Sequence, residues 1–192
     1  MVEPSVQEVA NRVAALLISR KETIGVSESC CGGLISASLL ACPGASAYYR
    51  GGHVAYSAKS QRLYFPGTLL ADLKAGKVRY GGEDMVRARA LGVQADMGTT
   101  WGLAETGQVG PTFVQITRPE GPYAAGGGGI ARTATGKATG VLAVAGRGGT
   151  LRSRTVRTDL TDRSANMAEF AKAALCLLEE AIVSAERGSP KL

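Results

Sequence analysis

The chain has 192 residues, and its content of 45% hydrophobic and 20% charged residues excludes an intrinsically disordered protein. The net charge of +6 is typical of a mildly basic surface and also suits an anionic ligand such as a phosphate ester. Nucleic acid is a less favoured partner, because only 5% of the residues are aromatic and could stack on bases. No apolar run approaches the roughly 18 residues that a membrane-spanning helix needs, so no membrane partner is expected. We therefore expect one domain over residues 1–192, with a frayed tail from 187 to 192.

The first third of the chain predicts a helix, a strand and a second helix. Apolar residues recur at helical spacing over 6–17, and the pair Ser5 and Glu8 is a capping-box signature that marks the helix start. Residues 23–27 then form a short apolar run that is typical of a buried strand. This run passes directly into a glycine turn and a small-residue helix over 34–41.

The rest of the chain continues this alternation. Strands are expected at 53–56, 100–104, 140–145 and 151–158, and helices at 57–62, 83–95 and 167–182. Residues 105–111 are expected as a second glycine turn and 112–139 as a loop. Strands that alternate with helices predict the α/β class, as a single-domain layered sheet with flanking helices.

The glycine-rich stretch at 126–129 does not form a nucleotide-binding fingerprint. A P-loop ending at Gly136-Lys137 would need glycine at position 131 and a hydroxyl residue at 138, and both positions hold alanine. A dinucleotide fingerprint that starts at Gly126 would also need glycine at position 131. The stretch is therefore interpreted as a surface loop.

Cysteine usage indicates reduced thiols. The four cysteines, at positions 30, 31, 42 and 176, form no C-x-x-C pair, and His53 is the only histidine, so no metal site is expected. The amino terminus shows no signal-peptide pattern. We therefore expect an intracellular, cytoplasmic protein. Cys30 and Cys31 are interpreted as small buried apolar side chains rather than as reactive thiols.

Ser29 lies where the first strand ends and the next helix begins. Gly32 and Gly33 follow it, and the backbone N–H groups of residues 30–33 would be unpaired at a helix start. Such groups can bind an anion or a developing oxyanion, with Ser29 as a nucleophile at the carboxyl edge of the sheet. The alternative is that Ser29 only caps the helix, which is the commoner use of serine at that position.

Several segments resemble one known family, and they occur in the same order. Residues 27–34, Ser-Glu-Ser-Cys-Cys-Gly-Gly-Leu, are similar to the Ala-Glu-Ser-Cys-Thr-Gly-Gly-Leu signature of the CinA C-terminal domain family. Further similar segments lie at 43–52, at 54–57 in a Val-x-Tyr-Ser strand, at 106–111 in a Thr-Gly turn, and at Asp162-Arg163 before the last helix. The resemblance covers most of the chain, from Val6 to Ala181.

This family includes nicotinamide mononucleotide deamidases, so the resemblance implies an amidohydrolase that converts the carboxamide of this nucleotide to a carboxylate and ammonia. Ser29 corresponds to the proposed nucleophile and Tyr56 to a tyrosine that assists proton transfer; a lysine also assists it in the family, and Lys59 is the lysine expected to do so here. The residues expected to hold the substrate are Cys30, Gly32, Gly33, Thr106, Gly107 and Arg163. The resemblance implies no metal or organic cofactor, a small-molecule nucleotide as the substrate, and a homodimer.

The chain departs from the family pattern at several positions: Thr161 replaces a glycine, Met167 replaces an arginine, and the loop over 121–136 is longer. The departure that matters most concerns the base. The family lysine lies five residues after the tyrosine, where this chain has Gln61, and Lys59 lies only three residues after Tyr56. On a helix two residues amount to about 200° of rotation, and glutamine cannot act as a base. Two functions therefore stay open. One is an active amidohydrolase in which Lys59 or another cation takes the proton. The other is a catalytically weak or inactive relative that binds a nucleotide and acts as a sensor.

Overall fold

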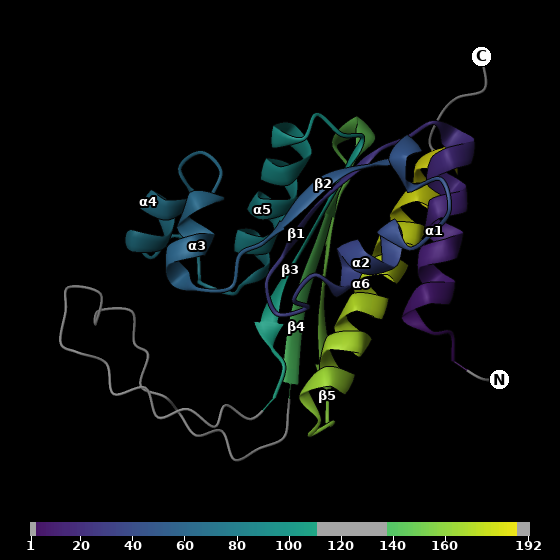
Figure 1. Ribbon diagram of the computed structural model, residues 1–192. Helices are drawn as coiled ribbons and strands as arrows, with labels where there is room; N and C mark the ends of the chain where they lie inside the picture. Colours follow the sequence, from purple (N-terminus) through teal and green to yellow (C-terminus); the bar gives the residue numbers. More distant parts are fainter. Residues whose placement is uncertain (1–2, 111–137, 188–192) are drawn as a thin grey trace.

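The computed structural model describes residues 3–110 and 138–187, which form one five-stranded sheet with helices on both faces (Figure 1). The strands are β1 (Ile24–Glu28), β2 (Tyr49–Val54), β3 (Trp101–Gln108), β4 (Ala138–Ala145) and β5 (Leu151–Thr158). The helices are α1 (Val6–Arg20), α2 (Leu34–Leu40), α3 (Ala58–Leu63), α4 (Leu69–Lys74), α5 (Glu83–Asp96) and α6 (Arg163–Arg187). The described residues also include two 3-10 turns, η1 (Ala45–Ala47) and η2 (Arg147–Gly149).

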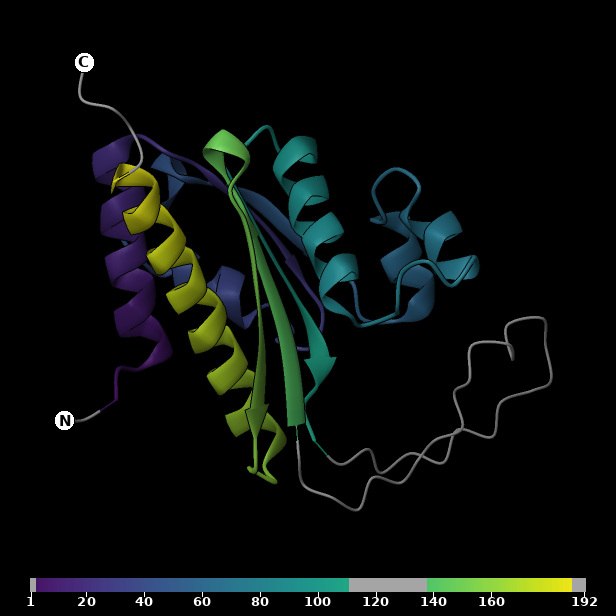
Figure 2. The same cartoon turned by 180° about the vertical axis from the view of Figure 1, so that it is seen from behind.

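The sheet has the strand order β2-β1-β3-β4-β5. β1 pairs in parallel with both β2 and β3, whereas β4 is antiparallel to β3 and β5 is antiparallel to β4. The carboxyl ends of β1, β2 and β3 therefore meet at one edge, which is the edge where open α/β sheets bind ligands. The first turns of α5 and α6 lie toward this same edge (Figure 2).

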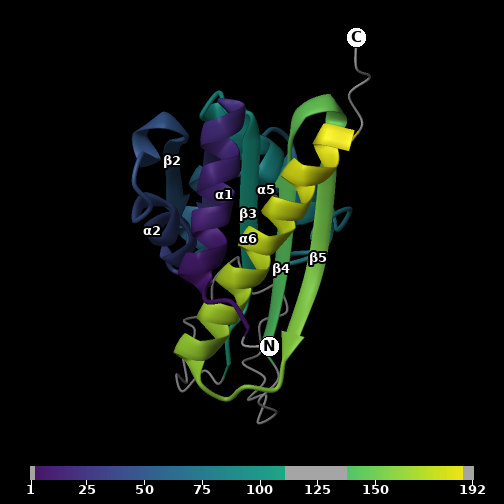
Figure 3. The same ribbon diagram turned by 90° about the vertical axis from the view of Figure 1, so that its right-hand side faces the viewer.

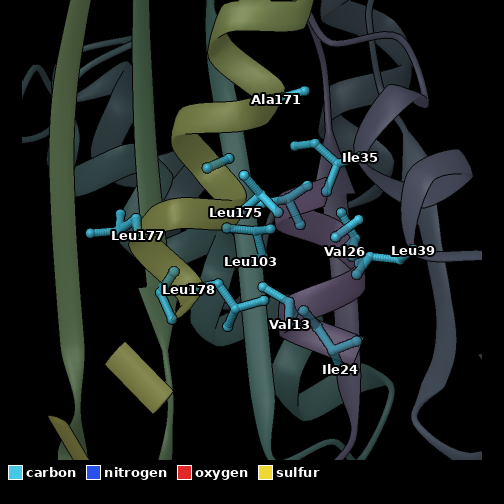
Figure 4. Packing of buried hydrophobic residues seen from close by; sticks show 14 of the residues in the cluster. Val13, Ile24, Val26, Ile35, Leu39, Leu103, Ala171, Leu175, Leu177 and Leu178 are labelled. Atoms are coloured by element: carbon cyan, nitrogen blue, oxygen red, sulfur yellow. The ribbon is translucent and has the colours of Figure 1, made fainter. Parts of the chain in front are cut away.

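The main core lies between the sheet and the helices α1 and α6, which pack side by side on one face (Figure 3). Leu175 of α6 and Val13 of α1 meet Val26 of β1 and Leu103 of β3 in this core (Figure 4). Burial of such side chains stabilises the fold by about 25 cal/mol per Å² of apolar surface. The packing thereby holds β1 and β3, the two strands that end at the ligand edge, in a fixed relation.

The opposite face of the sheet is covered by α5, which buries Met85, Val86 and Ala90 against β3 and β4. The helix lies very close to the sheet at one point. A Cβ atom on Gly102 of β3 would lie 2.1 Å from the carbonyl oxygen of Ala90. The lack of a side chain at Gly102 is therefore what allows α5 to pack directly on β3.

Replacing Gly102 with alanine is expected to lower the free energy of unfolding by about 3 kcal/mol, because the added methyl group must push the α5 backbone away from the sheet. Gly98→Ala is the matched comparison: its Cβ would meet nothing within 4 Å, and its φ of 58° costs about 1 kcal/mol for a residue with a side chain. Urea unfolding of the two variants measures the difference. Equal losses would show that the close approach at Gly102 is not tightly constrained.

Most expected elements are present, with shifts at their ends. The capping box of Ser5 and Glu8 at the start of α1 is confirmed, and β5 is an edge strand as expected. Two expectations are wrong. β2 ends at Val54 instead of beginning at His53, and residues 105–108 continue β3 instead of turning, because they pair with β4. The short helix α4 is not among the expected elements.

The expected loop at 112–139 lies outside the described residues as far as position 137, and positions 138 and 139 belong to β4. The expected tail lies outside them from position 188, whereas Arg187 ends α6. Within the part of the chain that the structure describes, no helix combines the length and the apolar character required to cross a membrane.

Candidate active site at the carboxyl edge of the sheet

The start of α2 is held by a buried carboxylate at the end of β1. The Glu28 side chain accepts hydrogen bonds from the backbone N–H groups of Gly33, Ile35 and Ser36 at 2.8–3.1 Å. Gly33 occupies the N-cap position, with a φ of 100° that favours glycine. Burial raises the pKa of Glu28, and its hydrogen bonds oppose this rise. The alternative that Ser29 is the helix cap is therefore wrong, because Glu28 takes this role.

A second buried carboxylate fills the turn that contains Ser29. One oxygen of Glu105, on β3, accepts the backbone N–H groups of Ser29 at 2.5 Å and of Cys31 at 2.9 Å, and the other accepts the Cys30 thiol at 2.8 Å. The N–H group of Gly32 donates to the Ser29 carbonyl at 3.3 Å. Three of the four amides that the sequence offers as an anion cradle are therefore already bonded within the chain: Cys31 to Glu105, Gly32 to the Ser29 carbonyl, and Gly33 to Glu28.

Arg89 of α5 connects the ends of β1 and β3. Its side chain is buried, and it donates to Ser27 Oγ at 2.8 Å, to the Glu105 carbonyl at 3.0 Å and to the Glu28 carbonyl at 3.3 Å. The guanidinium also places a positive charge near the buried Glu105 carboxylate, which offsets part of the cost of burying it. The turn after β1 is thus bonded to both neighbouring structural elements, β3 and α5.

Gln61 of α3 covers the hydroxyl of Ser29, which is 4% exposed. Its Nε2 donates to Ser29 Oγ at 3.2 Å and to the Tyr56 carbonyl at 3.3 Å, while the Tyr80 hydroxyl donates to its Oε1. Among the described residues, no other side chain is hydrogen-bonded to Ser29 Oγ. Lys59 lies on the exposed side of α3. The structure therefore brings Gln61, and not Lys59, to Ser29.

Tyr56 and Arg163 meet at the same edge of the sheet. Tyr56 follows β2 and is 61% exposed, and Arg163 is the first residue of α6. Arg163 Nη2 donates to the Tyr56 hydroxyl oxygen at 2.9 Å. These two expected site residues are therefore in direct contact, although 107 positions separate them in the sequence.

A cavity of about 730 Å³ opens at this edge, on the side of the sheet that α5 covers. The ends of β3, β4 and β5 form one wall, and the first turn of α5 with the segment before it forms the other. Thr106 and Gly107, both expected to hold the substrate, line it. Tyr80 lines it too and bonds to Gln61, so one wall of the cavity is connected to Ser29 by hydrogen bonds.

His53 of β2 forms part of the buried polar network behind Ser29. Its Nε2 lies 2.8 Å from Ser27 Oγ, and its ring stacks on Tyr64 with 3.8 Å between ring centroids. Because Arg89 donates two N–H groups to the Ser27 oxygen, the Ser27 hydroxyl proton is directed to His53. Burial, reinforced by the positive charge of Arg89, lowers the pKa of His53 to about 4, and Asp96 opposes this shift. His53 is therefore neutral at pH 7.

The low pKa of His53 predicts a loss of stability in mild acid. An unfolded chain binds a proton on histidine below pH 6.5, whereas the folded chain does so only near pH 4, so the free energy of unfolding falls as the pH drops from 6.5 to 4. Because solvent reaches the half-buried His53 side chain, we expect the free energy of unfolding to fall by about 1 kcal/mol, which is less than the pKa shift alone would give. His53→Gln retains an acceptor for Ser27, so its stability is expected to fall less over this range. Parallel pH curves for the two chains, from urea unfolding, would contradict this assignment.

Cys30, Cys31 and Glu105 are the only group of metal-ligand types that the described residues bring together, with ligand atoms within 4.8 Å of one another. A hydrogen bond from Cys30, burial and the charge of Glu105 all raise the pKa of the Cys31 thiol. The Cys30 thiol donates its proton to Glu105. Metals bind thiolates, so these protonated and mutually bonded groups do not fit a metal ion as they stand. Both cysteines are free and buried as expected, but Cys30 serves as a hydrogen-bond donor to Glu105 and not as a purely apolar side chain.

Sequence comparison identifies the family. The family model for the CinA C-terminal domain matches residues 6–135. The chain belongs to the CinA C-terminal domain family. A CinA-like protein of Synechococcus sp. (strain CC9902) is 39% identical over 111 residues, which cover 57% of this chain and 25% of that protein. A CinA-like protein of Cyanothece sp. (strain PCC 7425 / ATCC 29141) is 38% identical over 116 residues, covering 59% and 26%. The chain thus spans about a quarter of the length of these curated relatives.

Solved structures with CinA names share the fold. A competence-damaged protein (CinA) superfamily protein from Klebsiella pneumoniae 700603 matches with a TM-score of 0.70 and 25% identity, over 94% of this chain and 99% of that one. A competence or damage-inducible protein from Enterobacter asburiae matches with a TM-score of 0.73 and 22% identity, over 94% and 99%. The expected fold class and the expected family are both confirmed.

Three residues of this CinA-family site were not identified from the sequence. Arg89 does carry a signal, because it interrupts the buried stripe of Met85, Val86 and Ala90 on α5, and a charged residue in such a stripe indicates a buried partner. Glu105 and Tyr80 carry no comparable signal. From the sequence, Glu105 was expected in the turn at 105–111. In the structure β3 continues through position 105, and the Glu105 side chain bonds to the separate turn that contains Ser29.

Proposed function

We propose that this chain is an amidohydrolase that hydrolyses the carboxamide of nicotinamide mononucleotide to nicotinic acid mononucleotide and ammonia, with Ser29 as the nucleophile. The contact between Ser29 Oγ and residue 61 supports the proposal most directly, because the family pattern has its lysine at that position. The turn at Ser29 is also fixed by Glu105 and lies at the ligand edge of the sheet.

In the proposed reaction Ser29 Oγ attacks the carboxamide carbon, and its proton moves to a base. The C–N bond then breaks as the nitrogen takes up a proton and leaves as ammonia, and water hydrolyses the resulting ester to restore Ser29. Gln61 cannot accept the first proton, so Lys59 or another cation would have to reach Ser29. Tyr56 accepts an N–H group from Arg163, which leaves its own hydroxyl proton free to be donated to the leaving nitrogen.

One observation favours a second function, which is nucleotide binding without significant turnover. Gln61 fills the place beside Ser29 that a base would need, and it is held there by Tyr80. A missing general base typically lowers a rate by a factor of about 10² to 10⁴. The cavity would then act as a nucleotide sensor in the same fold. A homodimer is proposed with either function, because the family resemblance implies it, and a cytoplasmic location is proposed because the cysteine usage indicates reduced thiols.

Two measurements on the purified chain distinguish these functions: ammonia release from nicotinamide mononucleotide, and the shift in melting temperature that this nucleotide causes. An amidohydrolase gives both ammonia release and a positive shift. A sensor gives the shift alone. The absence of both would remove the nucleotide from either proposal. Light scattering of the same sample measures the oligomeric state.

A further inference from the structure

Two arginines line the cavity without a partner among the described side chains. Arg79 lies in the segment before α5, and Arg157 lies near the end of β5, so they belong to different walls. In the part of the chain that the structure describes, neither guanidinium forms an ion pair or a hydrogen bond. Arginine stays protonated at any physiological pH, so both groups present a permanent positive charge to the cavity.

The two acidic residues of the cavity wall are already compensated. Glu83 accepts the hydroxyl protons of Ser153 at 2.7 Å and of Thr155 at 3.1 Å, and these bonds lower its pKa. Arg87 lies 3.4 Å from Glu83 and 3.5 Å from Asp84, and it shares its charge between them. Arg87 does not line the cavity itself, but it pairs with the two carboxylates that do, and the charges of Arg79 and Arg157 are left without such a partner among the described residues.

The remaining wall supplies neutral hydrogen-bond donors. Thr106 and Thr139 contribute hydroxyl groups, and α5, a helix of 14 residues, opens into the cavity through Gly82 and Glu83. The first N–H groups of a helix and its dipole favour an anion. Arginines with several neutral donors suit a phosphate ester, because its oxygens accept many bonds at once. A volume of about 730 Å³ is within the usual range for a small-molecule site.

We propose that Arg79 and Arg157 bind the phosphate ester of a mononucleotide in this cavity, and that the rest of the ligand extends past Tyr80 toward Ser29. The assignment of the carboxamide as the end that reaches Ser29 rests on the proposed function. The phosphate site itself rests on the cavity and its two unpartnered arginines. Because a nucleoside lacks the phosphate dianion, this site makes the protein select the mononucleotide over the corresponding nucleoside.

The test is calorimetric binding of nicotinamide mononucleotide and nicotinamide riboside to the full chain carrying Ser29→Ala, which prevents turnover. The mononucleotide is expected to bind at least about 30-fold more tightly than the riboside, because two charge-assisted contacts are lost without the phosphate. Arg79→Gln and Arg157→Gln should each weaken mononucleotide binding about 10-fold and leave riboside binding unchanged. Arg152→Gln is the matched control, since Arg152 lies on the same strand β5 and does not line the cavity.

Equal affinity for the two ligands would overturn the phosphate site, and so would Arg79→Gln and Arg157→Gln chains that bind like Arg152→Gln. Failure of both ligands and of ribose 5-phosphate to bind would overturn it as well. Ammonia release by the unmutated chain keeps the two proposals separate. Arginine-dependent binding without ammonia release leaves the phosphate site standing and removes the amidohydrolase. Ammonia release with the same kcat/KM for mononucleotide and riboside would support the amidohydrolase and overturn the phosphate site.

Discussion

Replacing Ser29 with alanine is expected to lower ammonia release from nicotinamide mononucleotide by at least about 10⁴-fold, because no acyl ester can form without the hydroxyl oxygen. The change should lower the free energy of unfolding by only about 1 kcal/mol. Within the described part of the chain the hydroxyl forms one hydrogen bond, with Gln61, and the backbone of the turn is held independently by Glu105. An enzyme-coupled ammonia assay and a thermal melt of the same preparation measure both effects.

Ser60→Ala is the matched control for this variant. The Ser60 hydroxyl lies on α3 and, among residues 3–110 and 138–187, bonds only to Ser57, so its loss removes a serine near the site without touching the reacting atoms. We expect its rate to stay within about 2-fold of the unmutated chain, as for surface substitutions of small energetic effect. A Ser29→Ala chain that releases ammonia at the unmutated rate would exclude Ser29 as the nucleophile, whatever its stability.

Replacing Gln61 with lysine is expected to raise the rate of ammonia release by about 10² to 10⁴-fold, because it supplies a general base next to Ser29. The Gln61 amide nitrogen lies 3.2 Å from Ser29 Oγ, so a lysine amine can reach the same oxygen. Burial lowers the pKa of a lysine, which increases the fraction that is unprotonated near neutral pH. The rate should therefore rise with pH through this lysine's pKa, and a pH profile of kcat would record that limb.

Two further variants show whether a gain in rate comes from the lysine amine at position 61, from side-chain volume there, or from Lys59. Gln61→Met fills a similar volume without an amine and should release no more ammonia than the unmutated chain. Lys59→Ala tests the lysine that the sequence offers as the proton acceptor. If Gln61→Lys gives no increase and Lys59→Ala abolishes release, then α3 shifts during the reaction and Lys59 is the base. If the Gln61→Lys chain binds the nucleotide but releases no ammonia, and Lys59→Ala does not change ammonia release either, the sensor function is favoured.

Local periodicity was sufficient to predict most of the helices and strands, because their apolar faces have the spacing of the structure that buries them. It failed for residues 105–108, where Thr106 and Gly107 look like a turn. Their extended form depends on pairing with β4, whose position relative to β3 no local pattern encodes. It also failed for α4, which has one fully buried apolar residue, Leu69, and hence little periodic signal.

The site shows the same division between local and distant information. The motif at 27–34 located the turn and its serine correctly, because its glycines are needed for the local backbone path. It also suggested free amide groups, since nothing in eight residues reveals that Glu105 will bond to them from 76 positions away. The departure at Gln61 was visible in the sequence, and the structure adds that this residue, and not Lys59, contacts Ser29.

The contacts that complete the site have a consequence for how the protein is made. During synthesis the ribosome releases the chain from its amino end, so Ser29 emerges long before Glu105, and Tyr56 emerges 107 residues before Arg163. A nascent chain that ends before α6 carries the motif and Glu105, but it lacks Arg163, the partner of Tyr56, and the helix that covers the main core. The chemistry proposed at Ser29 is therefore expected only after α6 has been synthesised, and a truncation that removes α6 is expected to abolish it even though every residue of the motif remains.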